Sequence, residues 1–219
     1  YSQTYEKGKS KSKVKINKCK KNLKGTEISF TPDKEIFESI KFSPKKLYSF
    51  IKMKAVLVKG TKISFSVDKI LINDKTPNKE TFIYSKGIID YFQENFEKRK
   101  KILKNNFHCN FELNLKEKCE VYVSFNELEK SSMMSFCNTI ETPDGGSHEN
   151  AIKNALIKAI KIFGQKNQFT KSSNISLSDI FDFSDSFISI FISEPSFEGQ
   201  TKKRIAMPKI QKALENIIQ

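Results

Sequence analysis

Two stretches of alternating apolar and polar residues constrain the fold of this chain more than any other feature. Apolar side chains occupy every second position over residues 107–115 and again over residues 121–125. Such a period of two places these side chains on one face of a β-strand. The polar turn Lys116-Glu117-Lys118 joins the stretches, so we predict an antiparallel hairpin. Its apolar face requires a second layer, which helices can supply.

Further elements are predicted on both sides of this hairpin. Strands are expected at Gly25–Phe30, Ile63–Val67, Met133–Ile140 and Ser186–Ser193. Helices are expected from Ser43-Pro44 to Gly60, after Ser85, after Ser147 and from Pro208, because apolar residues follow at helical spacing. Loops are expected at Asp74–Glu80, Glu141–Gly146 and Glu194–Lys203. The fold class is therefore α+β or α/β, a sheet packed by helices, and the composition shift near Asp74–Glu80 suggests a domain boundary.

The chain is strongly basic, with a formal net charge of +14, and lysine supplies nearly all of its positive charge. Arg99 and Arg204 are the only arginines among its 39 basic residues. Lysine is a point charge, whereas arginine makes the bidentate contacts that read bases. Residues 1–25 hold nine lysines against Glu6 alone. This segment is either a solvated loop or one that contacts phosphates.

Several classes of protein are disfavoured by composition. No apolar run approaches the roughly 18 residues of a membrane helix, and no signal peptide is visible in the polar, lysine-rich first residues. The four cysteines are scattered and accompany only two histidines, so a zinc site is not expected. We predict a cytoplasmic protein with reduced thiols and no membrane partner.

Both ends of the sequence have the character of internal positions. The chain begins with Tyr1, and the helical pattern of Met207–Gln219 continues to the last residue without a stop signal. We therefore expect a fragment of a longer polypeptide.

Three loops could carry chemistry. The loop Asp144–Glu149 places two glycines before a helix, where free N–H groups favour anions, although from the residues alone a tight turn with an N-cap is favoured. His148 could be a general base, but without a nucleophile or partner acid a structural or capping role is favoured.

In the second loop, Gln200 and Lys202 could reach one phosphate together, or the lysine could simply be exposed. The third, Gly25-Thr26, offers a single hydroxyl.

No paired catalytic carboxylates, Ser/His/Asp set, P-loop or dinucleotide fingerprint is recognisable in the sequence. From the residues alone the function stays open.

Two long motifs in the second half resemble the signatures of one family. Residues 137–149 read Cys-Asn-Thr-Ile-Glu-Thr-Pro-Asp-Gly-Gly-Ser-His-Glu. They resemble the N-x-I-x-T-x-x-G-G-T-H signature of the B subunits of bacterial type IIA DNA topoisomerases. Residues 194–205 read Glu-Pro-Ser-Phe-Glu-Gly-Gln-Thr-Lys-Lys-Arg-Ile and look like that family's D/E-P-x-F-x-G-Q-T-K-x-R/K-L motif. The spacing between the two motifs matches as well.

Two motifs in the first half extend the resemblance over nearly the whole chain. Tyr1–Gly8 is similar to the start of Y-x-Q-x-F-x-x-G-K, and residues 25–37 resemble G-T-x-V-x-F-x-P-D-x-x-I-F. Phe42-Ser43-Pro44, Lys54–Leu57 and Gly60 are closer to the topoisomerase IV B subunit than to gyrase B, but the choice between the two stays open.

The resemblance implies a domain organisation. Residues 1–84 would be the C-terminal part of a GHKL ATPase sandwich. Residues 85–219 would be a transducer domain, a ribosomal-protein-like α/β fold whose last helix is cut short.

The resemblance also implies roles for three residues. Thr26 falls on the threonine that helps to hold adenine through water, and Gln200 and Lys202 fall on the pair that contacts the γ-phosphate of ATP. The family's E-N-x-x-D helix, adenine-binding D-x-G-x-G, glycine-rich lid and E-G-D-S-A segment have no counterpart here. The Mg²⁺ ligands would lie outside this chain, which alone should neither hydrolyse ATP nor cleave DNA.

The implied partners are double-stranded DNA, a topoisomerase A-type subunit and a second B subunit, in a nucleoid-associated cytoplasmic enzyme. The lysines of 45–62 and 98–104 are expected along the path of the transported DNA. Two alternatives stay open: a non-enzymatic basic nucleic-acid-binding module or degenerate paralogue, and another GHKL protein of the mismatch-repair or chaperone type.

Overall fold

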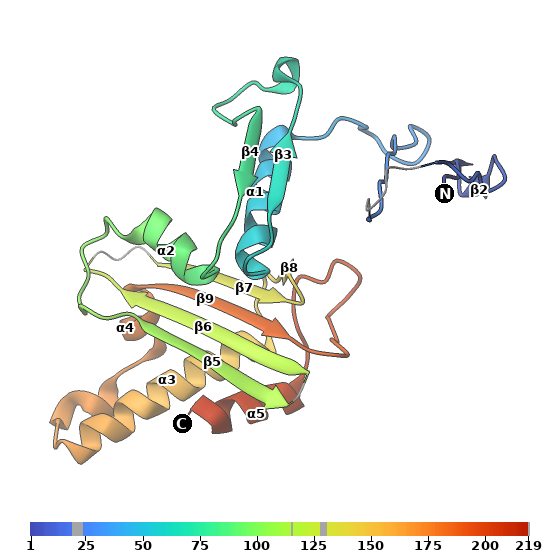
Figure 1. The fold of residues 1–219 in the computed structure, drawn as a ribbon. Helices are drawn as coiled ribbons and strands as arrows, with labels where there is room; N and C mark the ends of the chain where they lie inside the picture. Colours follow the sequence, from blue (N-terminus) through green and yellow to red (C-terminus); the bar gives the residue numbers. More distant parts are fainter. Residues whose placement is uncertain (19–23, 115, 128–130, 219) are drawn as a thin grey trace. The chain divides into compact units, whose positions relative to one another are not determined.

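The computed structural model describes residues 1–18, 24–114, 116–127 and 131–218. The chain divides into two units, Tyr1–Leu47 and Tyr48–Gln219, and each is described by itself (Figure 1). Within the described ranges, no helix combines the length and hydrophobicity needed to cross a membrane.

The first unit contains one short hairpin. Strands β1 (Tyr5–Glu6) and β2 (Lys9–Ser10) pair antiparallel. Lys7 and Gly8 join them with φ of 49° and 76°, the backbone of a two-residue turn with both central residues left-handed.

The strand predicted over residues 25–30 is wrong. These residues form no β-ladder, and the side chains of Ile28 and Phe30 are 81% and 72% exposed. A strand requires a neighbour for its N–H and C=O groups, and the described residues supply none here.

A five-stranded sheet is the centre of the second unit. Its strands are β5 (Phe107–Asn114), β6 (Glu117–Phe125), β7 (Ser132–Cys137), β8 (Ile140–Glu141) and β9 (Ser184–Phe191). Their order is β5-β6-β9-β7-β8; β7 and β9 pair in parallel, and the other described pairs are antiparallel. The predicted β5–β6 hairpin and the buried strand β9 are confirmed.

The single strand expected over Met133–Ile140 is wrong, because it is a hairpin of β7 and β8. Asn138 and Thr139 form its turn with φ of 47° and 67°. The alternation of polar and apolar residues does not reveal that the chain turns back here, since neither turn residue is glycine.

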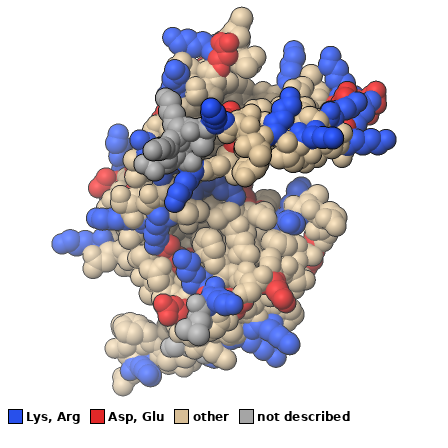
Figure 2. All heavy atoms as spheres, turned by 45° about the vertical axis from the view of Figure 1, so that its right-hand side comes forward, with Lys and Arg blue, Asp and Glu red and all other residues tan. Residues whose placement is uncertain are grey.

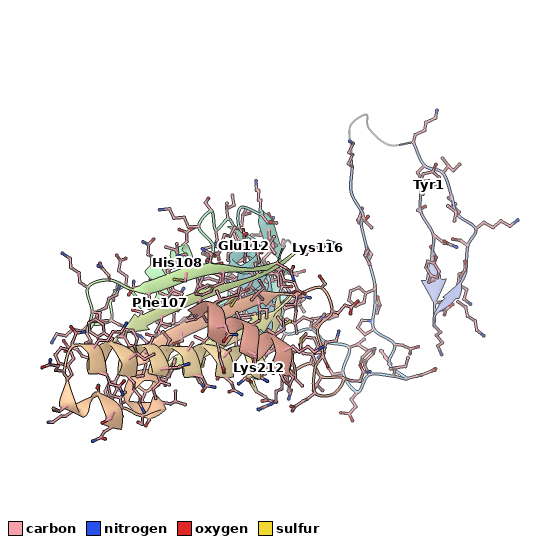
Figure 3. All side chains as sticks on the ribbon, turned by 90° about the horizontal axis from the view of Figure 1, so that it is seen from below. Tyr1, Phe107, His108, Glu112, Lys116 and Lys212 are labelled. Carbon is pink, nitrogen blue, oxygen red and sulfur yellow. The ribbon has the colours of Figure 1, made fainter. Side chains whose placement is uncertain are left out.

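The two faces of the sheet carry separate apolar clusters. α3 (Ser147–Lys166) and α5 (Pro208–Ile218) pack on one face against Val121, Val123 and Ile188. On the other face, α2 (Ile88–Phe96) and the end of α1 (Pro44–Leu57) pack with Tyr122 and Phe187. Figure 3 shows the same alternation along β5: Phe107 lies on the side of α3 and α5, whereas His108 and Glu112 lie on the opposite side.

Further short elements complete the second unit. They are the β3–β4 hairpin (Ile63–Ser66, Lys79–Phe82), two 3-10 turns (Lys69–Leu71, Thr170–Asn174) and α4 (Leu177–Phe181). β4 takes the last residues of the loop predicted to end at Glu80. Phe65 and Phe82 of the hairpin belong to the same cluster as α2 and Tyr122. This cluster joins residues from both sides of position 84, where the domain boundary stays a prediction.

The four predicted helices are confirmed, with corrected details. Gly87 and Gly146, rather than Ser85 and Ser147, occupy the N-cap positions of α2 and α3. In α1 the buried residues are Ala55–Leu57, whereas the apolar residues Leu47 and Phe50 are exposed.

A buried ion pair fixes one end of β9. Asp185 is 1% exposed, and Nη1 of Arg99 lies 2.6 and 2.7 Å from its two carboxylate oxygens. Ser132 and Asn126 donate further hydrogen bonds of 2.9 and 3.1 Å to the same carboxylate. A buried charge is tolerated only when it is paired in this way.

We expect Arg99→Ala to lower the free energy of unfolding by about 3 kcal/mol, because the substitution leaves the Asp185 carboxylate buried without its cation. Urea denaturation measures the change. Lys98→Ala, at an exposed neighbouring position, is the matched control and should cost less than about 0.5 kcal/mol. Equal effects of the two substitutions would contradict the assigned role of Arg99.

Candidate nucleotide-contact loop and its supports

The loop that follows β9 presents Gln200 and Lys202 at its tip. Its two arms pair through Glu198 N–H to Arg204 O, 2.9 Å, and Ala206 N–H to Ser196 O, 3.0 Å. The tip residues 198–204 are exposed. The loop predicted over 194–203 is confirmed, and an amide and an ammonium lie two positions apart at its exposed end.

The backbone of the tip is tightly turned. Gly199 and Lys202 have φ of 78° and 55°, and Lys202 N–H donates to Gly199 O at 3.3 Å. The Lys202 ammonium lies 5.9 Å from the centre of the Phe197 ring. A left-handed lysine costs about 1 kcal/mol, so the surrounding arms must hold the turn.

The Gly145-Gly146-Ser147 segment lies directly against the second arm of this loop. Ile205 N–H donates to Gly145 O, and Ser147 N–H donates to Ile205 O, both at 3.1 Å. Met207 N–H donates to Ser147 Oγ at 2.8 Å. The first N–H of α3 is thus already bound to the protein, and the geometry supports a structural turn rather than an anion site.

Gly146 is required by this close approach. Its φ is 130°, and a Cβ at this position would lie 2.3 Å from Ile205 O. No L-residue with a side chain fits there without moving the backbone of Ile205.

Asn138 supports the first arm of the same loop. Its side chain donates to Ile192 O at 2.8 Å and accepts from Ile192 N–H at 2.9 Å. The backbone N–H of Asn138 also donates to Ile190 O at 2.9 Å. Sequence reasoning missed this contact, because the two residues lie 54 positions apart.

His148 is a buried structural histidine, as favoured from the sequence. It is fully buried, its Nε2 lies 3.2 Å from Thr142 Oγ1, and Thr142 also contacts Ser135 Oγ at 2.8 Å. Burial lowers the pKa of His148 to about 4. The imidazole is neutral near pH 7 and is not accessible to a substrate.

Thr26 belongs to the other unit of the chain. It is exposed and follows Gly25, whose φ is 144°. Its predicted role at adenine, together with the roles of Gln200 and Lys202 at phosphate, stays a prediction. No group of three or more His, Cys, Asp or Glu side chains in the described ranges converges on a possible metal position.

Three of the six lysines in 45–62 contact the protein itself. Lys52 pairs with Glu94 at 2.7 Å and Lys59 with Glu120 at 2.7 Å. Lys54 Nζ lies 2.6 Å from Thr139 O and 2.7 Å from its Oγ1, and burial lowers the pKa of this lysine. The sequence alone did not separate these lysines from the exposed ones.

Glu94 shows how such a contact shifts acidity. Burial by itself would raise the pKa of Glu94, but hydrogen bonds from Lys52 and Tyr84 outweigh that effect and lower it. The carboxylate therefore stays ionised and ties α2 to α1.

The second basic stretch, 98–104, also contains both residues that pair within the protein and residues that face solvent. Arg99 binds Asp185, and Lys100 pairs with Glu127 at 2.6 Å. Lys101 and Lys104 line an open hollow of about 440 Å³ between α2 and the β5–β6 hairpin. Figure 2 shows lysine and arginine side chains spread over the visible face rather than gathered in one patch.

Comparison with known proteins assigns the family. The family model described as DNA gyrase B matches residues 87–219. The B subunit of DNA topoisomerase 4 from Rickettsia typhi is 35% identical over 221 residues, which covers 100% of this chain and 33% of that protein. The chain belongs to the family formed by DNA gyrase B and the B subunit of topoisomerase 4. It spans about a third of the length of the curated relatives it matches.

Solved structures agree with this fold. The B-subunit of the DNA gyrase from Myxococcus xanthus has a TM-score of 0.71 at 19% identity, covering 91% of this chain and 57% of that one. The topoisomerase IV ATP-binding domain of Francisella tularensis has a TM-score of 0.67 at 27% identity, covering 85% of this chain and 49% of that one. The mixed α+β fold is thus that of gyrase B-type structures.

We expect His148 to stay neutral in the folded protein until the pH approaches about 4. An exposed histidine titrates near 6.5, so the unfolded chain takes up its proton first as the pH falls. The stability that neutral His148 contributes is complete above about pH 6.5 and is lost progressively toward about pH 4, by up to about 3 kcal/mol.

NMR titration of the imidazole signals tests this directly, since the chain has two histidines. His148→Gln should reduce the loss of stability between pH 7 and pH 4.5, and His108→Gln is the matched control. A midpoint near 6.5 for His148 would show that the side chain is not buried as described.

Proposed function

We propose that this chain acts as the ATPase–transducer portion of the B subunit of an ATP-dependent type II DNA topoisomerase, coupling ATP binding and hydrolysis to DNA strand passage. The observation that carries the proposal is the loop tip, where an exposed amide and an exposed ammonium stand on two hydrogen-bonded arms. Membership of the family supports it.

The chemistry of the tip suits a terminal phosphate. The Lys202 ammonium supplies a positive charge, and the Gln200 amide supplies a neutral donor. A contact made only to the γ-phosphate exists with ATP and is absent with ADP. This difference in affinity between two states is what a nucleotide needs to shift a conformational equilibrium.

The remaining parts of the site follow from the family resemblance. Thr26 is proposed to help hold the adenine through water. Mg²⁺ would neutralise phosphate charge when bound, but the described residues offer no converging ligand set, so we assign it no ligand in this chain.

The proposed partners are double-stranded DNA, an A-type subunit and a second B subunit, in the bacterial nucleoid. DNA would be held through phosphates without sequence readout, for which lysines suffice. The competing proposal is a non-enzymatic basic nucleic-acid-binding module, favoured by the exposed lysines alone.

We expect Lys202→Ala to slow ATP turnover at least tenfold in the complete subunit that carries this chain, with DNA affinity changed less than twofold. The reason is the loss of the charge proposed to contact the γ-phosphate. Lys203→Ala, at the next exposed position, is the matched control and should retain turnover. Unchanged turnover in Lys202→Ala would reject the nucleotide-contact role and favour the binding module.

We expect the double charge reversal Lys98→Glu and Lys104→Glu to weaken DNA binding. The slope of log K against log salt concentration should decrease in magnitude by about 2, one for each phosphate that is no longer neutralised. Both lysines are exposed and near α2. The matched control is Lys166→Glu with Lys171→Glu, exposed residues beside the opposite face of the sheet. Equal salt slopes for both pairs would remove 98–104 from the DNA path.

A further inference from the structure

One short segment, residues 138–147, binds both arms of the Gln200–Lys202 loop. We propose that Asn138 and Ser147 are positioning residues, which hold this loop at a fixed place relative to the sheet and thereby determine how strongly the protein prefers ATP over ADP. The inference rests on the proposed function of the loop and deepens it. We refer to Asn138, Gly146 and Ser147 as the loop clamp.

The first arm is bound as if Asn138 were one more strand residue. The amide satisfies both the N–H and the C=O of Ile192, at 2.9 and 2.8 Å. Ile192 is the residue directly after β9 and is 4% exposed. The chain therefore leaves the sheet in one direction, and the loop begins from a fixed point.

The second arm is bound by the start of α3. Gly146 and Ile205 form a parallel bridge, and Ser147 Oγ accepts from Met207 N–H at 2.8 Å. Ile205 is 1% exposed, so the arm returns into the core next to the helix that covers the sheet. Both arms of the loop are thus hydrogen bonded to residues of one ten-residue segment, 138–147.

The clamp is itself fixed to α1. The Lys54 ammonium binds the carbonyl and hydroxyl of Thr139, the residue next to Asn138. A movement of the loop must therefore be accompanied by movement of the β7–β8 turn and the contacts of α1, or the hydrogen bonds must break.

Fixing the arms matters because the tip residues are exposed. A loop that is free at its bases loses conformational entropy when it binds a phosphate, whereas one held in place has already lost it. Loosening the clamp should weaken only those interactions that the tip makes. ADP lacks the γ-phosphate, so its affinity should not change.

The experiment uses substitutions that delete the clamp contacts without straining the backbone. Asn138→Gly removes the amide and keeps a residue that tolerates the φ of 47°. Ser147→Ala removes the hydroxyl, and Ser147→Thr restores one. Asn150→Ala, exposed on the first turn of α3, is the matched control.

The first measurement is hydrogen exchange of residues 192–207 in the 219-residue chain. We expect Asn138→Gly and Ser147→Ala each to raise the opening equilibrium of this loop about tenfold, which corresponds to about 1.4 kcal/mol. Ser147→Thr and Asn150→Ala should match the unchanged chain. Unchanged exchange in both deletion variants overturns the proposal.

The second measurement compares the affinities of ADP and a non-hydrolysable ATP analogue in the complete subunit. We expect both deletions to reduce the preference for the analogue about tenfold, with ADP affinity unchanged and the preference restored by Ser147→Thr. Loss of affinity for both nucleotides alike, or an unchanged preference where Lys202→Ala lowers it, overturns the positioning role.

The failure of the proposed function gives a different result. In that case Lys202→Ala itself leaves the nucleotide preference unchanged, so the loop does not sense the γ-phosphate. The hydrogen-exchange measurement alone then tests whether the clamp residues fix the position of the loop.

Discussion

The parallel pairing of β7 with β9 is the constraint on which the rest of the second unit depends. β9 is buried and hydrogen bonded on both sides, antiparallel to β6 and parallel to β7. Parallel strands need a crossover connection, and α3 lies in the segment between them and covers the sheet. Because parallel strands end at the same edge, Cys137 pairs with Ile190, and the residues that follow them become neighbours. The contact between Asn138 and Ile192 is a direct consequence of this register.

The opposite end of β9 shows what the basic residues do. Asp185 is buried there and needs a cation. Arg99, in the basic stretch 98–104 that follows α2, provides it. Around α1, Lys52 and Lys59 pair with Glu94 and Glu120, and Lys54 donates to the carbonyl of Thr139. A net charge of +14 therefore overstates the charge available to a partner, since several cations already bind carboxylates or carbonyls of this chain. The exposed lysines, rather than the total, are the ones available to the DNA that we propose as a partner.

Periodicity predicted most of the second unit correctly, because most of its strands and helices have one apolar face, and the central strand β9 is buried along most of its length. It failed where a local pattern depends on a distant partner. Residues 25–30 alternate like a strand, yet no described neighbour pairs with them, and the Asn138-Thr139 turn interrupts an apolar run without glycine. The exposed loop with Gln200 and Lys202 could be predicted from its residues. Its supports could not, since each joins positions more than 50 residues apart.

The two motifs that carry the family resemblance in this half of the chain are one physical unit. Residues 137–149 provide Asn138 to one arm of the loop and Gly146 with Ser147 to the other, while 194–205 provide the arms and the tip. Gly146 has no room for a Cβ against Ile205, and Asn138 satisfies both polar groups of Ile192. We therefore expect a substitution at the clamp to loosen the loop even though no clamp residue contacts the tip. The Gly-Gly-Ser-His sequence, which as a loop before a helix could bind an anion, is better explained as the support of the residues proposed to do so.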